Sequence, residues 1–116
     1  RHGQPLLVYI LSGEYIETRG EDRRLCVQKT IQYIPAGTLH GNIFEGECKC
    51  LMVQFRPEEL RSLPELPEEP AEIAGVAAQW LANRMEREFH LRDDVSALAL
   101  EGILLESLAE LVRSNA

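Results

Sequence analysis

Residues 6–14 read LLVYILSGE, and this stretch decides the architecture expected for the first half of the chain. Residues 6–11 form a continuous apolar run, which is typical of a strand that is buried on both faces. Residues 12–14 then supply the small and polar side chains of a turn. Because the run does not alternate between apolar and polar residues, it does not indicate which of its side chains point inward.

Similar short runs follow as far as about residue 56. The clearest is residues 33–40, YIPAGTLH, in which an apolar strand enters a Pro-Ala-Gly turn and His40 follows the glycine by three residues. Short strands separated by turns at spacings of about 8–12 residues are typical of an antiparallel barrel or sandwich. Besides residues 6–11, the expected strands are 15–18, 23–27, 31–34, 42–44 and 48–55.

The chain changes character near residue 56. Proline at the first helical position predicts a short helix at residues 56–60, and residues 64–70, PELPEEP, predict an extended proline-rich connector. Two longer helices are expected, at about residues 71–89 and from a cap at Asp93 or Asp94 to about residue 113. The prediction is one compact domain with three parts, namely residues 1–56, 57–70 and 71–116.

The second long helix carries an apolar arc that covers roughly half of its circumference at 100° per residue. Such an arc is too broad for burial against one neighbour, and it suggests contact with the first helix on one side and with the barrel or a second subunit on the other. We expect Trp80, on the first long helix, to belong to the core or to anchor a dimer. The residues predicted to form the helix–helix contact of a dimer are Leu98, Leu105, Leu108 and Val112.

Composition excludes several classes of function. The net charge of the chain is −7, and 19 acidic residues face 12 basic ones, so this segment is not expected to bind nucleic acid by itself. No apolar run approaches the roughly 20 residues of a membrane span. The three cysteines make an odd number, which argues against a secreted disulfide framework and favours reduced thiols in the cytoplasm.

Three stretches together resemble one family. YILSGE at residues 9–14 resembles the "YVLSGE" strand and turn of AraC-type transcription regulators, and YIPAGTLH at residues 33–40 resembles their "IPPGxPH" strand and turn. Residues 88–89 (EF) and 98–106 (LALEGILLE) resemble the helical "REF…LALEGLLLE" segment. The chain is thus similar to the N-terminal cupin-type sensing domain of a bacterial AraC-type regulator.

The resemblance implies an α+β fold, with a cupin-like antiparallel β-barrel (a double-stranded β-helix) followed by an α-helical pair. It implies a cytoplasmic homodimer that binds a small-molecule effector in the barrel, needs no cofactor and is not an enzyme. DNA would be bound only through a helix-turn-helix half that these 116 residues do not contain.

The expected pocket residues are His2, Tyr9, Tyr33 and His40, because barrel interiors take alternate residues of each strand. By the same resemblance, His2 and His40 align with metal-ligating histidines of metal-binding cupins. Leu6, however, occupies the position of the carboxylate ligand. A leucine cannot bind a metal, so no metal is expected, and if one were bound, His2 and His40 would be its ligands.

Two alternatives stay open at this point. The chain could be a stand-alone cupin that acts as a small-molecule-binding module, or a metal-dependent cupin enzyme whose purified form carries stoichiometric metal. Cys48 and Cys50 lie two residues apart and would share one face of a strand, where they could meet a ligand or an oxidant. Packing is the simpler role for such small side chains.

Overall fold

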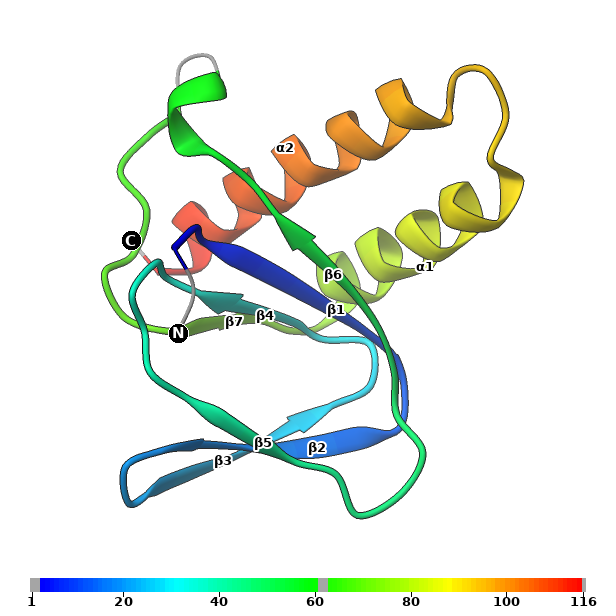
Figure 1. Cartoon of the computed structure of the whole chain (residues 1–116). Helices are drawn as coiled ribbons and strands as arrows, with labels where there is room; N and C mark the ends of the chain where they lie inside the picture. The colour runs from blue at the N-terminus through cyan, green and yellow to red at the C-terminus, as the bar shows by residue number, and fades with distance from the viewer. Residues whose placement is uncertain (1–2, 61–62, 116) are drawn as a thin grey trace.

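The structure is a computed structural model that describes residues 3–60 and 63–115. These residues form three layers, in which a pair of α-helices covers one sheet and a second sheet lies on the other side of the first (Figure 1). The described strands are β1 (Leu6–Ser12), β2 (Glu14–Arg19), β3 (Asp22–Val27), β4 (Ile31–Ile34), β5 (Gly41–Ile43), β6 (Lys49–Gln54) and β7 (Ala71–Ile73). The described helices are the short 3₁₀-helix η1 (Pro57–Glu59) and the α-helices α1 (Val76–Leu91) and α2 (Ser96–Ser114).

The first sheet has the strand order β6-β1-β4-β7, and all its neighbouring strands are antiparallel. The central strand β1 is buried on both faces along residues 6–11, as its apolar run predicts. Its odd-numbered residues belong to the core that packs under the helices, whereas its even-numbered residues belong to a second apolar cluster. That second cluster also contains Tyr15 and Cys26 of the other sheet, so it fills the space between the two sheets.

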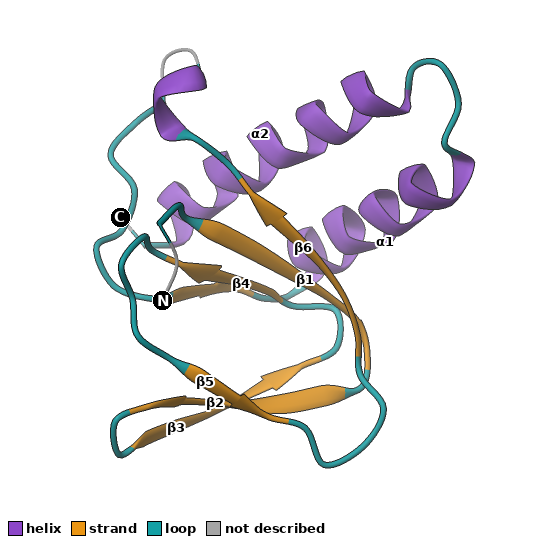
Figure 2. Ribbon diagram, in the orientation of Figure 1, coloured by secondary structure: helices purple, strands orange, loops and turns teal. Residues whose placement is uncertain are grey.

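The second sheet has the order β3-β2-β5 and is separate from the first (Figure 2). The predicted α+β class and the antiparallel strands are confirmed, and each of the six expected strands is found within a few residues of its predicted bounds. Closure into one barrel is not observed for the described strands. Two of the edge strands, β5 and β7, have only three residues each, which leaves few backbone groups to pair the sheets edge to edge.

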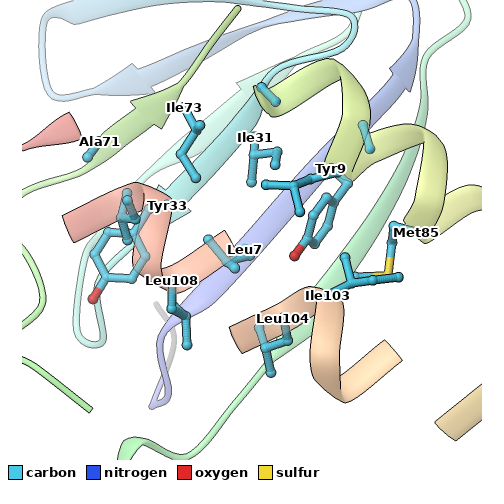
Figure 3. Packing of buried hydrophobic residues seen from close by; sticks show 14 of the residues in the cluster. Leu7, Tyr9, Ile31, Tyr33, Ala71, Ile73, Met85, Ile103, Leu104 and Leu108 are labelled. Atoms are coloured by element: carbon cyan, nitrogen blue, oxygen red, sulfur yellow. The ribbon is translucent and has the colours of Figure 1, made fainter. Parts of the chain in front are cut away.

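Helices α1 and α2 form an antiparallel hairpin over the outer face of the first sheet (Figure 1). Burial of apolar side chains holds them there, since Met85 from α1 and Ile103 and Leu108 from α2 join the main core (Figure 3). Leu81 of α1 belongs to the same core. None of the described helices is long and apolar enough to cross a membrane.

The predicted start of the first long helix at residue 71 is wrong. Residues 71–73 form β7, which extends the first sheet by pairing Ile73 with Ile31 and Ala71 with Tyr33 of β4. Gly75 then adopts a φ of 86°, a conformation that glycine tolerates best, and α1 begins at Val76. The apolar residues at 71 and 73 belong to a strand because they alternate with the partly buried Glu72.

The other helix predictions hold in part. The predicted cap of α2 at Asp93 or Asp94 is wrong, because the N-cap is Val95, although Asp93 Oδ1 accepts hydrogen bonds from the backbone N of Val95 and from Oγ of Ser96, both at 3.1 Å. Trp80 is 54% exposed, so it is not a core residue of this chain, and the Arg84 guanidinium lies over its ring at 4.5 Å from the centroid.

Candidate functional site

Polar side chains are buried between the two sheets, on β2 and β3 of the second sheet. Glu17 lies two residues after Tyr15 on β2 and therefore points to the same side, toward the first sheet. It is only 4% exposed. Arg24 is its partner in the antiparallel register, and the Arg24 Nη2 donates a hydrogen bond of 2.8 Å to Glu17 Oε1. A buried carboxylate is thus held by one charge-assisted bond.

The facing polar group comes from the first sheet. Gln32 pairs with Val8 of β1 and is fully buried on the side of the sheet that faces the second sheet. The Gln32 Nε2 donates hydrogen bonds of 2.9 Å to Thr30 Oγ1 and to Glu72 Oε2. Glu72 is opposite Gln32 in the register of β4 and β7, so the short strand β7 adds a second carboxylate to this space.

The two groups of side chains are close enough to act on each other electrostatically. Burial by itself lowers the pKa of Arg24, but the hydrogen bond and charge of Glu17, and then the charge of Glu72, raise the pKa overall. The pKa of Cys26 is raised, first by burial and then by the charges of Glu17 and Glu72. Because Glu72 belongs to the other sheet, its effect on both residues indicates one shared polar region between the sheets.

Two buried acceptor atoms in this region lack a hydrogen-bond donor among the described residues. They are Oε2 of Glu17 and Oε1 of Gln32. A buried polar atom without a partner costs about 1–3 kcal/mol, and a charged one costs more. Such atoms are uncommon in folded proteins, and a bound molecule or an ordered water can satisfy them. The arrangement is therefore suited to a ligand that donates hydrogen bonds.

A hollow of about 290 Å³ opens onto this region. It is lined by Glu17, Arg19, Asp22, Arg23 and Arg24, all from β2 and β3. Beyond the polar groups, the space between the sheets is filled by apolar side chains, among them Leu6, the residue that occupies the expected carboxylate position. Glu17 and Arg24 thus lie where a charged surface hollow meets a buried interior.

Tyr9 and Tyr33, two of the predicted pocket residues, lie on the opposite face of the first sheet. Their side chains point toward the helices (Figure 3) and belong to the core cluster there. The Tyr9 hydroxyl donates a hydrogen bond of 2.7 Å to Ser107 Oγ of α2. Tyr33 also borders a wide hollow of about 940 Å³ beside the proline-rich segment. The structure therefore does not bring these tyrosines together with Glu17 and Gln32.

His40, the third predicted pocket residue, is half-buried in the loop between β4 and β5. The fourth, His2, lies outside the described residues. Within residues 3–60 and 63–115, no three histidine, cysteine, aspartate or glutamate side chains are grouped so that they could hold a metal ion.

Glu17, Arg24 and Gln32 were not among the residues predicted for a site. A signal for Glu17 was present, because a strand places Tyr15 and Glu17 on one face, and Tyr15 follows a predicted turn. Arg24 could have been found only through the register of β2 with β3. No local pattern distinguishes Gln32, which lies in a short strand whose four residues are all buried.

The residues predicted for a dimer contact are divided between two environments. Leu98 and Leu105 of α2 are 72% and 40% exposed, Val112 is half-buried, and Leu108 is buried in the core of its own chain. An apolar groove of about 320 Å³ lies between edge strand β6 and the two α-helices. The groove is lined by Leu51, Met52, Val53, Met85, Phe89, Leu100, Glu101 and Leu104.

No model of a known protein family matches the chain, and a search of functionally characterised proteins finds no match either. The assignment of a function therefore rests on the residues and on their geometry.

Proposed function

We propose that the chain is the effector-sensing and dimerisation domain of an AraC-type transcription regulator, with a cupin-like arrangement of its two sheets. A small molecule would bind between the sheets, and DNA would be bound through a helix-turn-helix half outside these residues. The observation that carries the binding role is the pair of buried acceptor atoms, Glu17 Oε2 and Gln32 Oε1, that lack a donor among the described residues.

The hydrogen-bonding groups of this region determine which functional groups the ligand carries. Two free acceptor oxygens require donors, so the ligand carries hydroxyl, amine or amide N–H groups. The Arg24 guanidinium, held by Glu17, presents the cationic side of the region to acceptor groups of the same ligand. The hollow at Glu17 and Arg24, which Gln32 does not line, has a volume of about 290 Å³, close to the lower end of the range of roughly 300–1,000 Å³ that is usual for ligand pockets. A small polar metabolite fits these requirements.

The first sheet connects this site to the helices. Gln32 faces the second sheet, and its neighbours in the chain, Ile31 and Tyr33, pack in the core under α1 and α2. Next to Ile31 in the register lies Tyr9, which is hydrogen-bonded to α2 through Ser107. A ligand bound at Gln32 would thus act on a strand whose other face carries the helical pair, and sensing would require this contact to differ between the free and the bound state.

The test of the binding role uses the purified chain and a panel of small polyols, amines, amides and amino acids. A binder at 100 times its Kd stabilises the fold by about 2.7 kcal/mol, which a thermal-shift assay detects as a raised Tm. We expect Glu17→Gln to weaken that binder by about tenfold or more, because hydrogen bonds to charged groups are worth about 1.5–3 kcal/mol.

Glu14→Gln is the matched control, because Glu14 is on the same strand but exposed. It should leave the affinity unchanged. Equal affinities of wild type and Glu17→Gln for every binder would show that the ligand does not contact Glu17. In that case the space between the sheets is not the effector site.

Dimerisation would use the exposed part of the apolar arc of α2. Leu98 and Leu105 lie on its solvent-exposed side, whereas Leu100 and Leu104, which line the apolar groove, lie on the side that packs toward the sheet. Leu105→Glu places a charge in this contact and should shift the chain toward monomer in analytical ultracentrifugation. If Leu105→Glu keeps the association state of the wild type, the interface assignment is wrong.

A further inference from the structure

Cys48, which immediately precedes β6, and Cys50, the second residue of this strand, form a pair of thiols. Both are half-buried, and their Sγ atoms are 3.4 Å apart. They pack against the apolar cluster between the two sheets, which also contains the fully buried Cys26. The pair takes no part in the polar region formed by Glu17 and Gln32.

The backbone positions this pair tightly. Lys49 is opposite Ser12 and Cys50 is opposite Ile10, so the register of β1 and β6 shifts at this point. Gly13, at a φ of 79°, lies directly under residues 47–48, and a Cβ at this glycine would clash with the carbonyl of Glu47 and come within 3.0 Å of Cys48 Cα. The two thiols are therefore held in place by a bulge and a close backbone contact rather than by a free loop.

The 3.4 Å between the two sulfurs is a non-bonded contact, because a disulfide needs about 2.05 Å. This separation leaves room for one atom that is bonded to both sulfurs. Two thiolates on one tetrahedral zinc ion, each at about 2.3 Å, lie about 3.8 Å apart. A pyramidal centre with a narrower S–X–S angle brings them closer, toward the observed 3.4 Å.

The surroundings of the two thiols favour an uncharged product in any reaction that they undergo. Burial, and then the hydrogen bond with Cys48, raise the pKa of the Cys50 thiol to about 12, so this thiol is protonated at neutral pH. No third cysteine, histidine or carboxylate joins the pair closely enough to complete a metal-binding group within the described residues. A molecule that bridges the two sulfurs must therefore react with both thiols and need no further ligand from the protein. Its central atom must carry its own third substituent.

We propose that Cys48 and Cys50 form a dithiol site that captures a trivalent, thiophilic arsenical. In the reaction R–As=O + 2 R′SH → R–As(SR′)₂ + H₂O, R is the substituent on arsenic and R′SH is a cysteine thiol of the protein. Two As–S bonds form and the As–O bond breaks. The two thiol protons leave with the oxygen as water, so arsenic stays trivalent and no oxidant is needed. The product is uncharged, which suits a half-buried site beside an apolar cluster.

The test uses phenylarsine oxide and the reduced full chain, analysed by mass spectrometry under native conditions. We expect one arsenical per chain and two thiols lost to a thiol reagent. Cys48→Ser and Cys50→Ser should each weaken binding by at least about 100-fold, because the second bond of a chelate forms at a high effective concentration. Cys26→Ser is the matched control and should keep full binding.

Other outcomes would overturn the proposal. Retention of the adduct in the Cys48→Ser/Cys50→Ser double variant, or its loss in a folded Cys26→Ser variant, would place the reactive thiols elsewhere. If the chain rapidly lost the mass of two hydrogen atoms in air and bound no arsenical, the pair would form a disulfide instead. Cys48→Ala and Cys50→Ala replace the serine variants if circular dichroism shows that serine prevents folding. Glu17→Gln should bind the arsenical normally, so the result is independent of the proposed effector site.

Discussion

A hydrogen bond between Tyr9 and Ser107 connects the first sheet to α2. The Tyr9 hydroxyl donates to Ser107 Oγ, which in turn donates to the Ile103 carbonyl, and each bond is 2.7 Å long. Tyr9→Phe removes the first bond and should lower the free energy of unfolding by about 1 kcal/mol. Ser107→Ala leaves the buried Tyr9 hydroxyl without its acceptor, and should cost about 1–3 kcal/mol. Urea denaturation of both variants measures these values.

The double variant Tyr9→Phe/Ser107→Ala provides the control. Once both polar groups are gone, no unpaired hydroxyl remains, so its loss of stability should be smaller than the sum of the two single losses. A strictly additive result would mean that the two side chains do not interact in solution.

Gly13 and Gly20 give a matched test of backbone geometry. Both have positive φ values, 79° and 59°, which cost an L-residue about 1–2 kcal/mol. Only Gly13 lacks room for a Cβ, because residues 47–48 lie against it, whereas nothing lies within 4 Å of a Cβ at Gly20. We therefore expect Gly13→Ala to lower the thermal midpoint clearly more than Gly20→Ala does. Equal shifts would indicate that the contact with residues 47–48 is absent in solution.

Helix α2 has one face for the core and another for solvent. Leu108 is 2% exposed and Leu98 is 72% exposed. Leu108→Ala should lower the free energy of unfolding by about 2–5 kcal/mol, because it opens a cavity under the helix. Leu98→Ala should change it by less than about 0.5 kcal/mol, as surface substitutions usually do. A large loss of unfolding free energy in Leu98→Ala, measured at concentrations where the chain is monomeric, would contradict this division of the helix into two faces.

The strands and helices were largely predictable because their signals are local. Turn residues bound each strand of residues 6–55, and the long helices show their periodicity in the sequence. Strand β7 was missed because three residues carry no period of their own, and its position depends on pairing with β4, some 40 positions earlier.

The candidate site was less predictable because it depends on which face of each strand is turned inward. The run at residues 6–11 is apolar throughout, so nothing in it distinguishes the face of Tyr9 from the face of Leu6. In the structure Tyr9 contacts the helices, while Leu6 and Gln32 face the second sheet. Only the packing of three layers settles that choice, and it is a property of the whole chain.

At the scale of the molecule, the three-layer core is rich in groups that must stay neutral. Burial is the first cause of a raised pKa at each of them, namely Tyr9, Tyr15, Cys26, Tyr33 and Cys50. A group whose pKa is raised on folding stabilises the fold fully below its unfolded pKa. This stabilisation is lost as the pH rises toward its folded pKa. The unfolded values are about 8.5 for cysteine and 10 for tyrosine, so the loss begins above about pH 8.5.

The stability of the fold should therefore be nearly constant with respect to these groups from pH 6 to about 8 and should fall steadily at higher pH. Urea midpoints measured at intervals between pH 6 and about pH 10.5 would give the curve. Cys50, whose pKa is raised to about 12, contributes to the first part of the fall. Cys50→Ser removes that thiol, so its curve should fall less steeply between about pH 8.5 and 10 than the wild-type curve, whatever its absolute stability. Parallel curves for the two proteins would mean that Cys50 is not buried as a neutral thiol, and the dithiol site would then lose one of its supports.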